Sequence, residues 1–171
     1  MTRPQTRNTR HLPLLVFLIL ATSQPALGQY NQNDLLAGLD SIGARVGLTW
    51  DEDLPLDEAA TGSRLQAVFE LELRTHGIQV AREYSPELVL SLILSYSGSS
   101  LVAYSPDSFL VEWVAPTRYG VADTVLAYSS TWDGRKGVGI ARQEDLLETL
   151  EARVREGAQE FATAWRAANP R

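Results

Sequence analysis

The sequence predicts an α+β domain of two layers, in which two helices cover one face of a mostly antiparallel, four- to five-stranded sheet. Residues 86–98 alternate between apolar and other side chains, which is typical of a strand. Further alternating runs follow after short connections, which favours antiparallel pairing. Apolar residues recur at steps of three and four over residues 143–168, which indicates a helix with one buried side. The expected order of elements is β-α-β-β-β-β-α.

The first 28 residues are predicted to be a signal peptide. Three arginines precede an apolar run at residues 12–21, and the small residues Ala26 and Gly28 occupy the two positions that a signal peptidase inspects for cleavage after Gly28. The apolar run is shorter than the roughly 20 residues that span a membrane. We therefore expect an exported protein, periplasmic or secreted, with no transmembrane segment in the mature chain.

Charge and cysteine content narrow the possible partners. The chain has 15 basic and 21 acidic residues, and removing the leader with its three arginines leaves 12 against 21, a net charge of −9. Nucleic acid is not an expected partner, because phosphate binding needs clustered cations. The absence of cysteine excludes disulfides, thiolate metal sites and a lipid anchor on cysteine.

The mature chain is predicted to hold a disordered start, residues 29–33, and one domain, residues 34–171. Asn33 is expected to cap a short helix that ends near Leu39. Residues 45–50 alternate as a strand does, although two glycines interrupt the run.

An acidic loop at residues 51–58 precedes the first long helix. We expect this helix to begin at Ala59 or Ser63 and to end at His76, because Ser63 and Gln66 have the spacing of a capping box. Gly77 suits the left-handed residue that follows a helix, and residues 78–82 are predicted to form a short strand.

The central strand and its neighbours set the faces of the sheet. Four leucines at positions 88, 90, 92 and 94 are predicted to face the helices. Residues 109–115 and 125–132 are predicted to be the next strands. The last helix is expected from Gln143 to about Ala168, because Asn169 and Pro170 stop it.

The opposite face of the sheet is the candidate partner surface. It mixes aliphatic with polar side chains, a composition that suits another envelope protein or a second copy of this chain. An uncovered face with scattered aliphatic residues and no partner is the equally weighted alternative. The predicted residues of this face are Val89, Ser91, Ile93, Ser95, Leu110, Glu112 and Val114.

Three other stretches do not complete a chemical site. His76 has no nucleophile or carboxylate in register, so we interpret it as a helix-end residue. In the acidic run, Pro55 and Leu56 fall where a calcium loop needs ligands and a glycine. The glycine-spaced loop at 134–139 lacks a phosphate-binding order and is predicted to be a flexible connector, with weak anion binding as the alternative. No metal or cofactor is expected.

Several segments resemble a group of uncharacterised exported bacterial proteins. They are residues 72–80, the strand end Ser130-Thr131-Trp132 with its glycine loop, and the helix end 167–170. The layout is also similar, at the level of the fold alone, to the lipopolysaccharide-assembly lipoprotein and to auxiliary lipoproteins of lipid-transport systems. These resemblances imply an envelope module without naming its partner.

The sequence therefore favours a non-catalytic binding or assembly module of the cell envelope. The alternative is a carrier of a small hydrophobic or glycan ligand between helices and sheet, which would use the aromatic residues between positions 96 and 132. A hydrolase is the third hypothesis, because no nucleophile and base are visible together.

Overall fold

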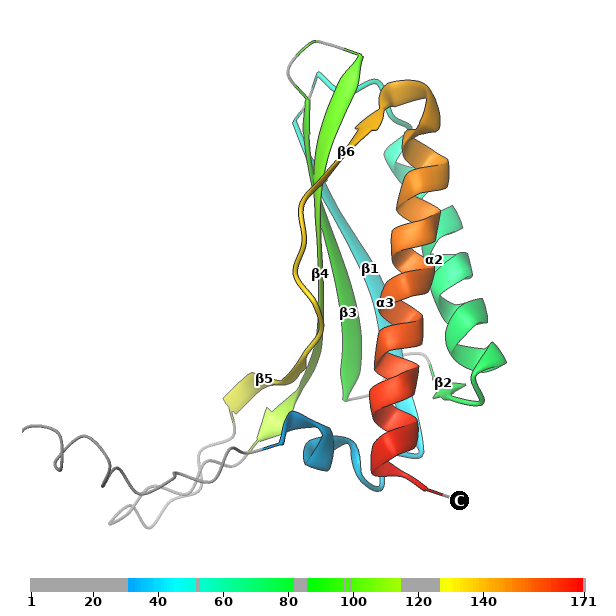
Figure 1. The fold of residues 1–171 in the computed structure, drawn as a ribbon, viewed down its shortest axis with the longest axis vertical. Coiled ribbons are helices and arrows are strands. Elements are labelled where there is room, and N and C mark those ends of the chain that lie inside the picture. Colours follow the sequence, from blue (N-terminus) through cyan, green and yellow to red (C-terminus); the bar gives the residue numbers. More distant parts are fainter. Residues whose placement is uncertain are drawn as a thin grey trace, which may run out of the picture. The chain divides into compact units, whose positions relative to one another are not determined.

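The computed structural model describes residues 31–51, 53–81, 86–96, 98, 100–114 and 127–170. They form a six-stranded sheet with two long helices against one face (Figure 1), which confirms the α+β prediction. The predicted signal peptide and residues 115–126 lie outside the described residues. No helix in the described part of the chain is long and apolar enough to cross a membrane.

The elements are longer at several places than the sequence predicts. The short helical turn η1 begins at Gln32, inside the stretch expected to be disordered, and Asn31 rather than Asn33 caps it. The strand β6 was not predicted. In chain order the elements are η1 (Gln32–Leu36), β1 (Ser41–Trp50), α2 (Glu58–Thr75), β2 (Gln79–Val80), β3 (Glu87–Tyr96), β4 (Leu101–Val114), β5 (Ala127–Asp133), β6 (Gly139–Arg142), η2 (Gln143–Asp145) and α3 (Leu146–Ala168).

The sheet has the strand order β2-β1-β3-β4-β5, and β6 pairs with β4 beyond the end of β5. β1 runs parallel to both β2 and β3, so α2 is the crossover between the parallel strands β1 and β2. The remaining pairs, β3–β4, β4–β5 and β4–β6, are antiparallel.

The core lies between the leucine face of β3 and the two helices. Leu88, Leu90 and Leu92 are fully or almost fully buried. Phe69 of α2 and Phe161 of α3 are wholly buried in the same cluster, as the helical spacing predicts. Each such side chain stabilises the fold by about 1.5–3 kcal/mol through the apolar area that it removes from water.

The first long helix starts earlier than predicted. Asp57 caps it by accepting a hydrogen bond from the Ala60 N–H at 3.0 Å, so the Ser63 capping box is wrong. The Gln66 side chain instead bonds the Ala44 carbonyl and the Val46 N–H, both at 2.8 Å. This amide occupies the place of a neighbouring strand along the outer edge of β1.

The C-terminal end of α3 fixes the N-terminal turn of the domain. The Trp165 indole N–H donates to the Leu39 carbonyl at 2.8 Å. Asn169 ends the helix, as predicted, and its amide bonds the Leu36 carbonyl at 2.9 Å and the Gly38 N–H at 2.7 Å. Residues 36–39 are therefore part of the folded domain.

Candidate interaction surfaces

The sheet face away from the helices carries the β3 residues that the sequence assigns to it. Ile93 is 54% exposed there, and Ser95 is also exposed. Ser91 is half-buried. Val89 lies on the same face but is only 6% exposed, with Arg45 of β1 and Phe109 of β4 as its cross-strand neighbours.

The β4 part of the predicted face is wrong. Leu110 pairs directly with Leu88, so both side chains point to the helices, and Leu110 is fully buried. Glu112 and Val114 follow at alternate positions on that same side. The uncovered face instead carries Val111 and Trp113. Both alternating sets of residues 109–114 are apolar enough to face the core, so only the pairing with β3 decides between them.

Exposed apolar side chains gather on this uncovered face. Among the described residues, seven large apolar side chains are exposed, and five of them lie on it: Ile93, Leu101, Trp113, Tyr128 and Ile140. The rings of Trp113 and Tyr128 contact each other, with centroids 5.3 Å apart. The aliphatic members lie toward the opposite end of β4, where β6 pairs with it.

The charges on the face are paired with one another. Arg45 bonds Glu87 at 3.0 Å, and Lys136 lies 3.4 Å from Asp107. The Tyr128 hydroxyl donates to the same Glu87 carboxylate at 3.4 Å. Partial burial raises the pKa of Tyr128, and the negative charge of Glu87 raises it further, so the phenol stays protonated. The uncovered face therefore combines exposed apolar side chains with acidic and basic side chains that neutralise each other.

The glycine loop is part of the sheet and not the flexible connector that the sequence predicts. The Gly134 N–H donates to the Ser108 carbonyl at 2.7 Å, and the Gly137 N–H to the Pro106 carbonyl at 3.4 Å. Two of its glycines permit this close approach: a Cβ on Gly134 would collide with Ser108, and one on Gly139 with the ring of Tyr104. The loop therefore continues the edge between β5 and β6.

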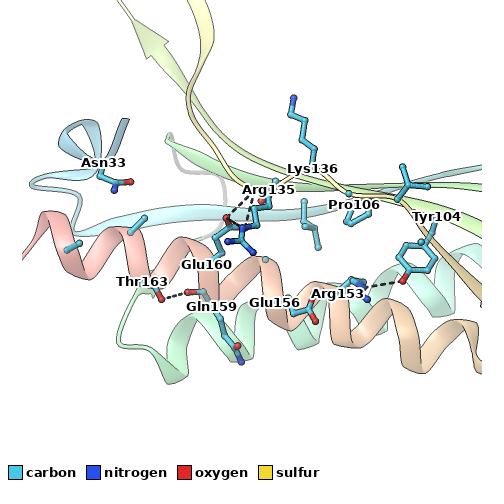
Figure 2. A pocket seen from close by; sticks show the side chains of 18 residues that line it. Asn33, Tyr104, Pro106, Arg135, Lys136, Arg153, Glu156, Gln159, Glu160 and Thr163 are labelled. Atoms are coloured by element: carbon cyan, nitrogen blue, oxygen red, sulfur yellow. Dashed lines mark hydrogen bonds and ion pairs between the residues drawn. The ribbon is translucent and has the colours of Figure 1, made fainter. Parts of the chain in front are cut away.

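Residues 134–142 form the edge segment of the sheet. A groove of about 760 Å³ lies between this edge segment and α3 (Figure 2). Figure 2 shows Arg153 reaching the Tyr104 hydroxyl, at 3.2 Å, and Glu160 reaching Arg135, whereas Lys136 points away from α3. Hydrogen bonds to Tyr104 and Glu156 raise the pKa of Arg153, so it remains charged. Because Glu156 and Glu160 pair with the two arginines, the groove is polar but not strongly charged.

The other predicted candidates have structural surroundings. His76 follows α2 directly, and its Nε2 lies 3.2 Å from the Glu72 carboxylate one turn earlier. In the acidic run, Asp57 caps α2 and Asp51 accepts hydrogen bonds from Ser95 and Tyr96. The described residues contain no group of three or more side chains placed to hold a metal ion.

The sequence pattern did not predict that the edge segment pairs with β4, and it did not predict a strand at residues 101–108. Pro106 interrupts the apolar pattern there, and proline is unusual inside a strand. Its carbonyl points to Gly137, and within a strand the nitrogen of the same residue points the same way. The ladder to β3 therefore loses no hydrogen bond. The one available signal was the alternation of Val102 with Tyr104, both of which are buried.

No family model matches this chain, and no curated protein matches it. Among solved structures, the chain is similar to a PelC dodecamer from Paraburkholderia phytofirmans. The TM-score is 0.37 and the sequence identity 14%, over 75% of this chain and 90% of that chain. A likeness at this level does not establish a shared fold, and the resemblance to exported bacterial proteins stays a prediction.

Proposed function

We propose that this protein is an exported, non-catalytic binding module of the cell envelope, and that its uncovered sheet face docks on another protein. The observation that carries the proposal is the gathering of five exposed large apolar side chains on one face. A folded chain ordinarily scatters such residues over its surface, and their concentration on one face favours an interaction surface.

The chemistry of the face favours a protein over a nucleic acid or an anionic membrane. Its cations Arg45 and Lys136 each pair with an acid of the same face, so they form no cluster for phosphates. The exposed Trp113 and Tyr128 belong to the residue types that are enriched where proteins meet. The face combines exposed apolar side chains with paired charges of both signs, and protein–protein interfaces combine apolar and polar groups in the same way.

Cross-linking in envelope fractions tests the proposal. The double variant Ile93→Lys/Trp113→Lys places a charge at each end of the face and should abolish cross-linking to a partner protein. Leu71→Lys is the matched control, because Leu71 is 65% exposed on α2, away from the face. The control should retain the same cross-linked partner as the wild type.

The proposal fails if the double variant still cross-links to the partner. It also fails if the wild type and the Leu71→Lys control have no cross-linked partner in common. The unfolding temperatures of all three proteins must agree within a few degrees, because only exposed side chains change. A large fall for the double variant would require the single variants to be compared instead.

A second candidate function rests on the groove beside α3. The carrier hypothesis places a ligand between helices and sheet, but that layer is filled by side chains such as Leu90 and Phe161. The groove lies at its margin, and a volume of about 760 Å³ is within the usual range for ligand sites. Its paired charges and the exposed Gln159 suit a neutral glycan better than a lipid.

Titration with neutral oligosaccharides, followed by backbone amide resonances, tests this second candidate. Binding should move the resonances of residues around Arg153 and Gly137, and Arg153→Ala should abolish the changes. Shifts confined to the sheet face around Ile93 would contradict it. The hydrolase hypothesis has less support, because His76 lies near one carboxylate, Glu72, and the Thr75 hydroxyl of the same pocket donates to the Leu71 carbonyl.

A further inference from the structure

The outer edge of the sheet from Lys136 to Arg142 presents its backbone to solvent. The Gly137 N–H bonds the Pro106 carbonyl, and the Gln143 N–H bonds the Ser100 carbonyl at 2.8 Å. Both contacts continue the register of β6 with β4. The backbone N–H and C=O groups of the odd-numbered residues therefore point toward β4. The N–H and C=O groups of Lys136, Val138 and Ile140 therefore point outward, and within the described part of the chain nothing bonds them.

The side chains of this edge make it unusual. Val138, which directly precedes β6, is 83% exposed, and Ile140 of β6, two positions further along the same edge, is 69% exposed. Proteins generally protect a free edge with charges, proline or a covering element, because an apolar edge with open hydrogen-bonding groups pairs with other strands. Here the charges Lys136 and Arg142 occur only at the two ends of the segment.

Two other parts of the sheet edge are covered by side chains. Along β1 the Gln66 side chain bonds Ala44 and Val46 in the manner of an added strand. At the end of β5 the Asp133 N–H donates to the Gln32 side chain of η1 at 3.4 Å. The contrast identifies residues 136–142 as the place where this sheet accepts another strand.

We infer that the strand accepted at this edge is the same edge of a second copy of this chain. Two copies related by a two-fold axis at Gly139 would pair antiparallel over residues 136–142. Val138 of one copy then lies opposite Ile140 of the other, so the exposed aliphatic side chains meet twice across the axis. This register also places Lys136 opposite Arg142 of the other copy, whereas a shift of the axis by one residue leaves one of these two without an opposite residue in the segment. The two-fold arrangement is closed, because each copy uses the same edge segment in the one interface.

Local charge also fits a second copy. Arg135 lies 3.9 Å from Glu160, Lys136 lies 3.4 Å from Asp107, and Arg142 lies 3.5 Å from Glu144. The edge is therefore neutral, although the whole chain carries a net charge of −6. Two acidic proteins meet here without bringing uncompensated acids together, and a strongly charged foreign strand would find no complement.

The dimer does not depend on the proposed docking of the uncovered face, and sedimentation velocity over a concentration series tests it separately. The purified exported protein should form a dimer. Ile140→Pro should raise the dissociation constant by about tenfold or more, because proline removes an outward N–H and is tolerated on an edge strand. Ile140→Ala, which keeps the N–H, is the matched control and should weaken the dimer less.

A second proline variant keeps the test valid if Ile140→Pro misfolds. Val138→Pro alters the other central outward position and should weaken the dimer in the same way, with the circular dichroism of the wild type. A wild type that stays monomeric throughout the series overturns the inference. So does a dimer that both proline variants retain, or one lost only in Ile93→Lys/Trp113→Lys, which would assign it to the sheet face. Binding of a foreign extended peptide to a monomer would also overturn it.

The absence of cysteine from the chain allows a direct test of the register. In an antiparallel pair, directly opposed residues that exchange backbone hydrogen bonds have Cα atoms about 5.5 Å apart, which suits a disulfide. The double variant Val138→Cys/Ile140→Cys should therefore form an intermolecular disulfide faster than either single variant. Ile93→Cys, exposed on the face but away from the edge, is the control and should form none. Equal rates for all four variants would contradict the proposed pairing.

Discussion

The Ser105 hydroxyl donates a hydrogen bond to the Gly137 carbonyl at 2.9 Å. This carbonyl lies opposite Pro106, whose carbonyl accepts from the Gly137 N–H but which has no N–H to return. The serine side chain therefore supplies the donor that the proline lacks. One hydroxyl group completes the ladder between β4 and the edge segment at the residue where the sequence would otherwise break it.

Removing this hydroxyl should loosen the edge segment. Ser105→Ala leaves the Gly137 carbonyl without its donor, and we expect a loss of about 0.5–1 kcal/mol in the free energy of unfolding. The Gly137 amide should exchange its hydrogen faster, whereas amides within β3 should not change. Ser105→Thr is the control, because it keeps the hydroxyl and suits a strand. Equal exchange at Gly137 in all three proteins would show that the hydrogen bond is not needed.

A buried carboxylate joins the two helices. Glu151 of α3 is 8% exposed and accepts hydrogen bonds from Arg64 of α2 and from Arg155 one turn later. Burial alone would raise the pKa of Glu151, but the hydrogen bonds and charges of the two arginines outweigh it and hold this pKa below its usual value. The carboxylate is thus ionised and paired at neutral pH.

Glu151→Gln should lower the free energy of unfolding by about 1–2 kcal/mol at pH 7, because both arginines are partly exposed and their pairing is screened. A carboxyl group whose pKa is lowered by folding stabilises the protein above its unfolded pKa, and this contribution disappears as the pH falls through the folded pKa. The difference between wild type and variant should therefore shrink below about pH 4.5. Denaturant unfolding at several pH values measures it.

Glu148→Gln is the matched control for that measurement. Glu148 lies on the same helix and is exposed, and the described residues show no ion pair to it. Its substitution should change the unfolding free energy by less than about 0.5 kcal/mol at any pH. A pH-independent difference for Glu151→Gln would mean that packing, and not ionisation, explains its effect.

The sequence predicted the helices and the central strand well because their apolar periodicity persists over long stretches. The side chains that this periodicity assigns to the core are buried: Leu88, Leu90, Leu92 and Leu94 on the strand, and Leu150, Val154, Ala158 and Phe161 on the helix. It failed on β4, where Pro106 hides the strand and both faces of residues 109–114 are apolar. A bulge between Leu110 and Val111 shifts the pairing with β5, and no local signal announces it. The β3 residues of the candidate face lie on the uncovered side, whereas Leu110, Glu112 and Val114 lie on the helix side, because the pairing with β3 decides between the two sides of β4.

Two neighbouring glycines of the edge segment should respond differently to alanine. In Gly139→Ala the added methyl group would collide with the buried Tyr104 ring, so we expect a loss of about 1–3 kcal/mol in unfolding free energy. In Gly137→Ala the methyl group meets nothing within 4 Å, and the change should be neutral or slightly stabilising. Thermal unfolding measures both. Similar losses would mean that backbone conformation, and not the close approach to Tyr104, selects glycine here.

The glycines inside the two helices offer a sharper comparison, because both substitutions gain the same helix propensity. Gly62→Ala should stabilise the protein by about 0.5–1 kcal/mol, since its methyl group would lie 3.8 Å from the nearest atom, Leu48 Cδ1. Gly157→Ala would place its methyl group 3.0 Å from Leu90 Cδ1 of the sheet. Leu90 is 1% exposed and has little room to move, so the repulsion should cancel the gain and destabilise the protein. The double variant Gly157→Ala/Leu90→Val distinguishes the causes. If contact with Leu90 is responsible, Leu90→Val should lower the unfolding free energy less in the Gly157→Ala background than in the wild type. Additive losses would place the strain elsewhere.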